Sequence, residues 1–100
     1  MIVVAGTVPV RPDQREAAIR AALAMAEATN KEQGCISYRF ATDLADPNTV
    51  LIFEEWESDE ALARHFQTEH MRVFQAEIPR FVAGPASIKR YVVESASPMT

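Results

Sequence analysis

The hydrophobic and polar positions of this chain follow the period of a strand first and the period of a helix next. Ile2–Val8 is a short β-branched run ended by prolines, which predicts a first strand. From Asp13 to about Gln33 the chain is rich in Ala, Glu, Arg and Leu, and Gly34 is placed to end a helix. One face of this helix carries Ile19, Ala22, Leu23, Ala26 and Thr29. The N-terminal part therefore predicts one strand and one long helix.

The strand period returns in the next two segments. Cys35–Thr42 alternates so that Tyr38 and Phe40 share one face. Along Thr49–Glu57 the side chains alternate between two faces. One face carries Val50, Ile52, Glu54 and Trp56, and the other carries Leu51, Phe53 and Glu55. The Asp, Asn and Pro residues between the two segments favour a reversal, which predicts an antiparallel hairpin. If the hairpin pairs Tyr38 with Glu54 and Phe40 with Ile52, the Tyr38 side chain projects to the same side as Glu54.

Two capped helices and a last strand are predicted in the remainder of the chain. Ser58 and Thr68 have the side chains and the sequence context of helix N-caps. Leu62 and Phe66 give the first of these helices an apolar side, and the second is expected to break near Pro79. A last strand is predicted over Ser87–Glu94.

The resulting order of elements is β-α-β-β-α-β, the split βαβ arrangement of a ferredoxin-like α+β domain. In such a domain the helices cover one face of an antiparallel sheet. We expect residues 1–94 to form this domain and residues 95–100 to form a flexible tail.

Both faces of the predicted sheet carry apolar groups. Leu51 and Phe53 point away from the face that holds Trp56, whereas one set of helices covers only one face. A second copy of the chain is the economical cover, which predicts a homodimer packed sheet against sheet. Arg39 and Glu55 are expected to form a cross-strand pair at this interface.

The composition limits the classes of function. The 100 residues include 14 acidic and 10 basic ones, a net charge of -4 without a basic run, which argues against nucleic acid as a partner. No segment approaches the roughly 20 apolar residues that span a bilayer, and the apolar N-terminal run lacks the flanks of a signal peptide. Cys35 is the only cysteine, so no internal disulfide and no Cys/His metal spacing is expected. We therefore expect a cytoplasmic protein with no membrane partner.

Aromatic and titratable residues concentrate between residues 53 and 70, which makes this segment the first candidate for a site. It holds the only tryptophan, Trp56, and both histidines, His65 and His70. From the residues alone, Trp56 is better explained as a core aromatic that fixes the hairpin. Glu54 is either a pocket acid or base or the partner of an arginine, and each histidine has a structural alternative as a hydrogen-bonded helix residue.

Three motifs resemble the antibiotic biosynthesis monooxygenase (ABM) family, and within it the small quinol monooxygenases. The resemblance runs from Ile2 to about Tyr91 and is more specific for the fold than for the substrate. Its motifs are Glu32-Gln33-Gly34-Cys35-Ile36-Ser37-Tyr38-Arg39-Phe40, then Asp46-Pro47-Asn48, then Phe53-Glu54-Glu55-Trp56-Glu57-Ser58 with Ala61-Leu62, His65-Phe66 and Thr68-Glu69-His70.

The resemblance implies a dimeric α/β barrel with a pocket between sheet and helices in each subunit. Several members oxygenate phenols or quinols without flavin, haem or metal, because an electron-rich phenolate can pass an electron to O₂ itself. The protein then supplies deprotonation, oxyanion stabilisation and exclusion of water. No cofactor is expected, and the sequence has no GxGxxG, no P-loop and no cluster of metal ligands.

The resemblance also implies roles for particular residues. Trp56 would stand in the pocket wall, where its indole N–H can donate to a substrate oxygen. His65 is the first choice for general base and His70 the second, since an unperturbed imidazole pKa of about 6.5 suits proton abstraction near neutrality. Glu54 is the remaining candidate for catalysis. The expected substrate contacts are Tyr38, Phe40, Ile52, Leu62 and Phe66.

Three classes of function remain open at the level of sequence. The first is a cofactor-independent monooxygenase that oxidises a quinol or a related phenolic or polyketide-like substrate with O₂. The second is an isomerase of the autoinducer-2-degrading type, which would use Glu54 and a histidine. The third is a non-catalytic dimeric module that binds a small hydrophobic ligand. Haem degradation is disfavoured, because the working set of that branch corresponds here to Gly6 or Thr7, His65 and Gln75.

Overall fold

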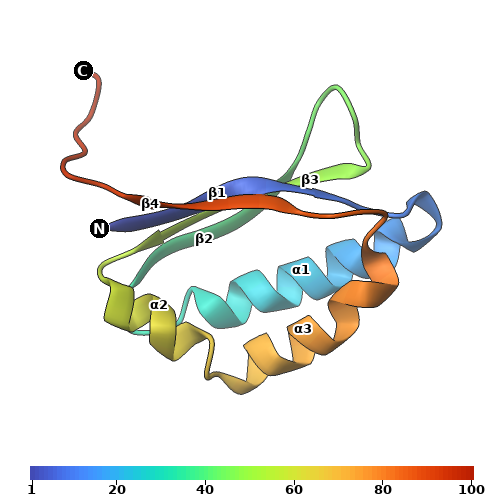
Figure 1. Ribbon diagram of the computed structural model, residues 1–100, viewed down its shortest axis with the longest axis horizontal. Helices are drawn as coiled ribbons and strands as arrows, with labels where there is room; N and C mark the ends of the chain where they lie inside the picture. Colours follow the sequence, from blue (N-terminus) through green and yellow to red (C-terminus); the bar gives the residue numbers. More distant parts are fainter.

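The computed structural model describes residues 1–100 and contains one antiparallel sheet with all its helices on one side (Figure 1). The strands are β1 (Ile2–Pro9), β2 (Cys35–Thr42), β3 (Thr49–Trp56) and β4 (Ser87–Val92). The helices are the short 3₁₀ turn η1 (Pro12–Gln14), α1 (Arg15–Thr29), α2 (Asp59–His65) and α3 (Glu69–Phe81). No helix is long and apolar enough to cross a membrane.

The strand order in the sheet is β2-β3-β1-β4, and every pairing is antiparallel. This is the predicted ferredoxin-like α+β fold, with the second helical segment divided into α2 and α3. The register of the hairpin is also as predicted. Tyr38 lies opposite Glu54 and Phe40 lies opposite Ile52, so all four side chains face the helices.

The first helix is shorter than its sequence predicts. It ends at Thr29, because the Asn30 side chain turns back on the chain: its Nδ2 donates to the carbonyls of Ala26 at 2.7 Å and Tyr38 at 3.0 Å. The Tyr38 amide donates to the Asn30 Oδ1 at 3.0 Å, so this one side chain ties the helix end to β2. Glu32 therefore lies in a connecting segment and not in a helix.

The ends of the remaining elements follow their local chemistry with two corrections. The hydroxyls of Ser58 and Thr68 accept from the amides of Ala61 at 3.1 Å and Met71 at 3.3 Å, which confirms both N-caps. The predicted break near Pro79 is wrong, because α3 continues to Phe81. A proline removes one backbone donor, and the flanking turns keep theirs. The predicted strand ends at Glu57 and Glu94 are one and two residues too long, since their partner strand begins at Ile2.

The core lies between the sheet and the helices, and the opposite face of the sheet is open. The outer face includes Phe53 and Tyr91, whose exposed fractions are 45% and 47%. Arg39 lies opposite Phe53, and Glu55 accepts a hydrogen bond from the Ser37 hydroxyl at 2.6 Å. The expected cross-strand pair between Arg39 and Glu55 is therefore wrong within this sheet, because the register places each against another residue.

Candidate functional site

A cavity of about 570 Å³ lies between the inner face of the sheet and the helices. Its size falls in the range of sites for drug-sized ligands. Almost all the side chains around it are apolar, and Glu54 is its one carboxylate. Strand residues in its wall include Val4, Tyr38, Phe40, Ile52 and Glu54, and helix residues include Ile19, Phe66, Met71, Phe74 and Ile78. We refer to this space as the sheet–helix cavity.

The structure brings five of the nine predicted site residues to this cavity. These are Tyr38, Phe40, Ile52, Glu54 and Phe66. The other four, Trp56, Leu62, His65 and His70, do not line it. Trp56 and Leu62 belong to the buried core cluster, which also includes Tyr38 and Ile52. His70 lines a smaller hollow of about 260 Å³.

Glu54 and Trp56 form a buried pair because alternate residues of a strand share a face. The indole Nε1–H of Trp56 donates to Glu54 Oε1 at 2.9 Å. Burial raises the pKa of Glu54 from 4.5 to about 7, with a smaller increase from the Glu32 carboxylate, while the hydrogen bond from Trp56 acts in the opposite direction. The partner of this carboxylate is thus an indole and not an arginine. Its proton can be exchanged near neutral pH.

Tyr38 lies beside Glu54 in the cavity wall and is 2% exposed. Burial raises the pKa of its phenol far above the ordinary value, and the neighbouring carboxylate of Glu54 adds to the increase. The hydroxyl therefore stays protonated and available as a hydrogen-bond donor at neutral pH. Its ring and that of Phe40 pack edge to face with centroids 5.4 Å apart. A donor and a titratable acceptor thus stand next to each other in an apolar space.

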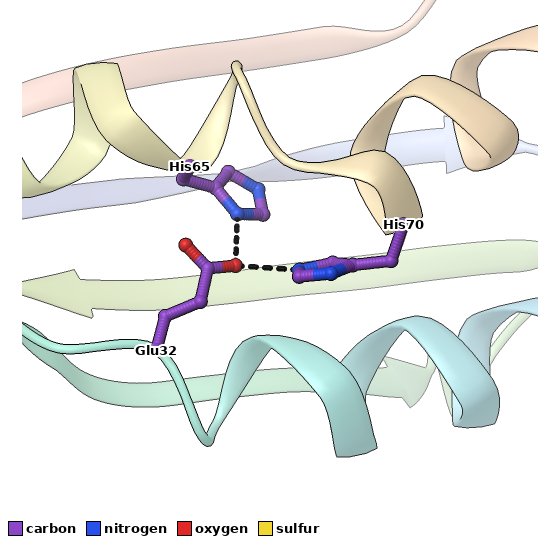
Figure 2. Close-up of side chains that lie close together, drawn as sticks. All are labelled: Glu32, His65 and His70. Atoms are coloured by element: carbon purple, nitrogen blue, oxygen red, sulfur yellow. Dashed lines mark hydrogen bonds and ion pairs between the residues drawn. The ribbon is translucent and has the colours of Figure 1, made fainter.

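A second polar group lies at the corner where α2 meets α3 (Figure 2). Glu32 Oε2 contacts His65 Nδ1 at 2.7 Å and His70 Nε2 at 2.6 Å. His65 is the last residue of α2, and its side chain is 1% exposed; the Glu32 side chain is 12% exposed. We refer to these three residues as the Glu32 cluster. They bring together the segment after α1 and the two later helices.

Sequence reasoning did not single out Glu32 as a site residue. The helical period predicted a helix through Gln33, where a glutamate is an unremarkable surface residue. The signal that could have found it is its place in the first family motif, directly before Gly34. Gly34 has φ +88°, and a Cβ there would approach the Ala61 Cβ to 2.5 Å, so the segment packs tightly against α2.

Two imidazoles and one carboxylate also form a chemically suitable set for a divalent metal ion, and their ligand atoms lie within 4.8 Å of one another. Ligand atoms that each lie about 2.0–2.2 Å from a tetrahedral zinc are roughly 3.3 Å apart. Here both nitrogens lie closer than that to a single oxygen, at hydrogen-bond length. The observed arrangement is therefore that of a hydrogen-bonded cluster.

Comparison with known proteins agrees with the fold and the motifs. The uncharacterized protein sll1783 of Synechocystis sp. is 41% identical over 92 residues, which cover 92% of this chain and 63% of that protein. The chain thus spans less than two thirds of the length of this relative. The probable quinol monooxygenase YgiN of Escherichia coli is 28% identical over 88 residues, covering 78% of this chain and 85% of that protein.

Solved structures and a family profile give the same assignment. The structure of Rv0793 from Mycobacterium tuberculosis superimposes with a TM-score of 0.88 at 26% identity, covering 96% of this chain and 98% of that one. Residues 1–77 match the profile of the antibiotic biosynthesis monooxygenase family. This match covers most of the chain, including the hairpin, Glu32, Glu54, Trp56 and both histidines. The chain therefore belongs to the antibiotic biosynthesis monooxygenase (ABM) family.

Proposed function

We propose that this protein is a monooxygenase that oxidises a quinol or a related phenolic compound with O₂ and needs no cofactor. The observation that carries the proposal is a buried carboxyl group with a pKa of about 7, Glu54, in the wall of a mostly apolar cavity. Such a group is suited to act as a general base near neutral pH. The name of the Escherichia coli relative, a probable quinol monooxygenase, points to the same substrate class.

The proposed chemistry begins with proton transfer from a phenolic hydroxyl to the Glu54 carboxylate. The O–H bond of the substrate breaks, its electron pair stays on the phenolate oxygen, and the phenolate then reduces O₂. One oxygen atom enters the ring and the other leaves as water, which takes two hydrogens from the substrate. The four electrons that O₂ accepts all come from the quinol as it becomes a hydroxylated quinone. No external reductant is required.

The neighbouring side chains have supporting roles in this proposal. Tyr38 donates a hydrogen bond to the substrate oxygen, and Phe40, Ile52 and Phe66 contact the ring and exclude water. Trp56 acts through Glu54, because its N–H is already used by that carboxylate. We place the first proton acceptor at Glu54 and not at either histidine, because neither histidine lines the sheet–helix cavity.

A homodimer is part of the same proposal. The outer face of the sheet exposes Phe53 and Tyr91 on a surface that no helix covers (Figure 1). Burial of apolar surface contributes about 25 cal/mol per Å², so a second copy packed on this face would be stabilised by it. The ferredoxin-like fold of dimeric α/β barrels is consistent with this association.

The test is oxygen consumption with a panel of one-, two- and three-ring hydroquinones, corrected for their autoxidation. We expect enzyme-dependent uptake of O₂ with at least one of them. Glu54→Gln should lower turnover by about 10²-fold or more, because the amide keeps the hydrogen bond from Trp56 but accepts no proton. Absence of uptake with every compound, from folded wild-type protein, would contradict the proposal.

The isomerase is the second candidate, since Glu54 could equally move a proton on a small hydroxy-carbonyl compound. The same apolar cavity argues for an aromatic substrate instead, because a small polar compound would lose its hydration without gaining enough partners. Binding of a hydroxy-carbonyl compound with rearrangement and no O₂ uptake would favour the isomerase. Binding without turnover would favour the ligand-binding module.

A further inference from the structure

Two buried polar side-chain atoms, Thr29 Oγ1 and His65 Nε2, have no hydrogen-bond partner, and the second belongs to a titratable ring. His65 Nε2 is buried and makes no hydrogen bond, whereas the Nδ1 of the same ring is bonded to Glu32. A buried polar atom without a partner is disfavoured, and a catalytic role is one of the explanations for its presence in a folded protein. The proposed chemistry at Glu54 makes no use of this nitrogen.

Glu32 determines which nitrogen of His65 carries the proton. An ionised carboxylate only accepts hydrogen bonds, so the nitrogen that faces Glu32 Oε2 at 2.7 Å must be the N–H of the ring. In the neutral imidazole the lone pair then lies on Nε2. His70 Nε2 donates to the same oxygen from the other side, and its side chain is 28% exposed. The carboxylate is thereby held between two N–H groups, which favours its orientation toward His65.

The ring of His65 lies directly behind the wall of the sheet–helix cavity. Its nearest ring neighbours are Trp56 at 4.8 Å, Phe66 at 5.5 Å and Tyr38 at 5.6 Å between centroids. Tyr38 and Phe66 also line the cavity, so a single layer of side chains separates it from the imidazole. Phe66 is the most exposed member of this layer, with an exposed fraction of 50%, and it follows the last turn of α2.

We propose that Glu32 is a positioning residue that holds His65 in the Nδ1–H form, so that Nε2 accepts a second substrate proton when the Phe66 side chain moves aside. This inference rests on the proposed function and explains why a quinol, which has two hydroxyl groups, would meet two acceptors. The second O–H bond breaks, its electron pair stays on the substrate oxygen, and an N–H bond forms at Nε2. The resulting imidazolium lies against the Glu32 carboxylate, which stabilises its charge. The protons held by Glu54 and His65 are returned to the oxygen atom that leaves as water.

The direct test measures the tautomer of His65 without any substrate. Long-range ¹H–¹⁵N spectra of the ¹⁵N-histidine-labelled protein distinguish a protonated ring nitrogen from an unprotonated one. We expect Nδ1–H in the wild type and in Glu32→Gln, whose side-chain oxygen still accepts from Nδ1. Glu32→Ala should shift the population to Nε2–H. Nε2–H in the wild type, or an unchanged tautomer in Glu32→Ala, would overturn the inference whether or not quinols are oxidised.

Kinetics then test the role of the positioned nitrogen. Glu32→Ala should lower kcat with the best quinol by about tenfold or more with little change in KM, and Glu32→Gln should restore part of the loss. Phe66→Ala should accelerate acylation of His65 by diethyl pyrocarbonate, since it removes the most exposed of the side chains that pack against the His65 ring. Unchanged kcat in Glu32→Ala, with the tautomer shifted, would overturn the acceptor role. O₂ uptake absent from the wild type despite the Nδ1–H form would contradict the proposed function, and the acceptor role with it.

Addition of Zn²⁺ tests the alternative that the Glu32 cluster binds a metal ion. If the Glu32 cluster is a hydrogen-bonded device, equimolar Zn²⁺ should leave the ¹⁵N signals of His65 and His70 unchanged. Loss of the Nδ1 proton at one equivalent of Zn²⁺ would show a metal site instead and would overturn the inference.

Discussion

Two opposing effects act on the pKa of Glu54. Burial raises it, the hydrogen bond from Trp56 lowers it, and burial is the larger effect. A carboxyl whose pKa is raised in the folded protein binds more protons folded than unfolded between its two pKa values. Its contribution to stability therefore falls as the pH rises from about 4.5 to about 7. The same ionisation produces the carboxylate that the proposed reaction needs. Activity and stability are thus expected to respond to this residue with opposite signs.

The first prediction concerns the stability of Glu54→Gln. Above pH 7 the wild type buries an ionised carboxylate, whereas the variant buries a neutral amide. The variant should therefore be more stable than the wild type, by up to about 3 kcal/mol for a pKa difference of this size. The difference should shrink as the pH falls toward 5, where the wild-type carboxyl is protonated. Urea unfolding at a series of pH values measures it. A difference independent of pH would show that Glu54 titrates normally.

The second prediction concerns Trp56→Phe, which keeps most of the packing and removes the N–H that Glu54 accepts. Because that hydrogen bond lowers the pKa of Glu54, its loss should raise the pKa further. The rising limb of the pH–kcat/KM profile should therefore move to higher pH than in the wild type. A profile that stays in place while kcat falls would instead mean that the indole contacts the substrate directly.

At the scale of elements, the end of α1 decides where Glu32 lies. Asn30 makes three hydrogen bonds at this point, to the carbonyls of Ala26 and Tyr38 and from the amide of Tyr38. Without these hydrogen bonds α1 could continue beyond Thr29. Glu32 would then be a helical residue, and its side chain would point in another direction. We therefore expect formation of the Glu32 cluster to depend on the Asn30 side chain.

The third prediction follows from that arrangement. Asn30→Ala should lower the free energy of unfolding by about 1–3 kcal/mol, since it leaves backbone groups of the helix end and of β2 without partners. It should also lower the population of the Nδ1–H tautomer of His65, because Glu32 is no longer held beside the ring. The same ¹H–¹⁵N spectra measure this population. Lys31→Ala is a matched control in the same segment, because the Lys31 side chain is exposed and its one ion pair is at 3.9 Å. Loss of stability with an unchanged His65 tautomer would show that the Glu32 cluster forms independently of the Asn30 hydrogen bonds.

At the scale of the whole molecule, the sheet has one face under the helices and one face open. The open face carries Phe53 in the centre of the sheet, opposite Ala5 and Arg39 on its neighbouring strands. A large, half-exposed aromatic in the middle of a sheet is typical of a surface that is covered in an assembly.

The fourth prediction tests that assembly. Phe53→Asp should shift the proposed dimer toward monomer at micromolar concentration, because it places a charge in an apolar contact. Leu44→Asp is the matched control, since Leu44 is fully exposed in the turn between β2 and β3. Sedimentation velocity measures the change. A wild-type chain that sediments as a compact monomer would contradict the homodimer.

The sequence by itself determined the elements, the faces of the hairpin and the fold. Alternation along β3 placed Ile52 and Glu54 on one side, because a strand reverses its side chains at every residue and needs no distant information. The side on which Tyr38 lies depended on the register of the hairpin, which was predicted conditionally and which the structure confirms. The caps at Ser58 and Thr68 could also be predicted from the sequence, since a cap is a contact between residues three positions apart. The end of α1 was not, because Asn30 stops the helix through bonds to a strand eight residues later.

Only the tertiary structure decided which polar groups meet. Glu32 lies 33 residues from His65 and 38 from His70, and their hydrogen bonds exist because α1, α2 and α3 pack on the same face of the sheet. The sequence placed both histidines shortly after the tryptophan but left open whether each one faces a ligand or is a hydrogen-bonded structural residue. It also left open the burial of Glu54, and burial is what raises its pKa. Local patterns specify the direction of a side chain within its element, whereas its partners and its exposure to water depend on every element that packs against it.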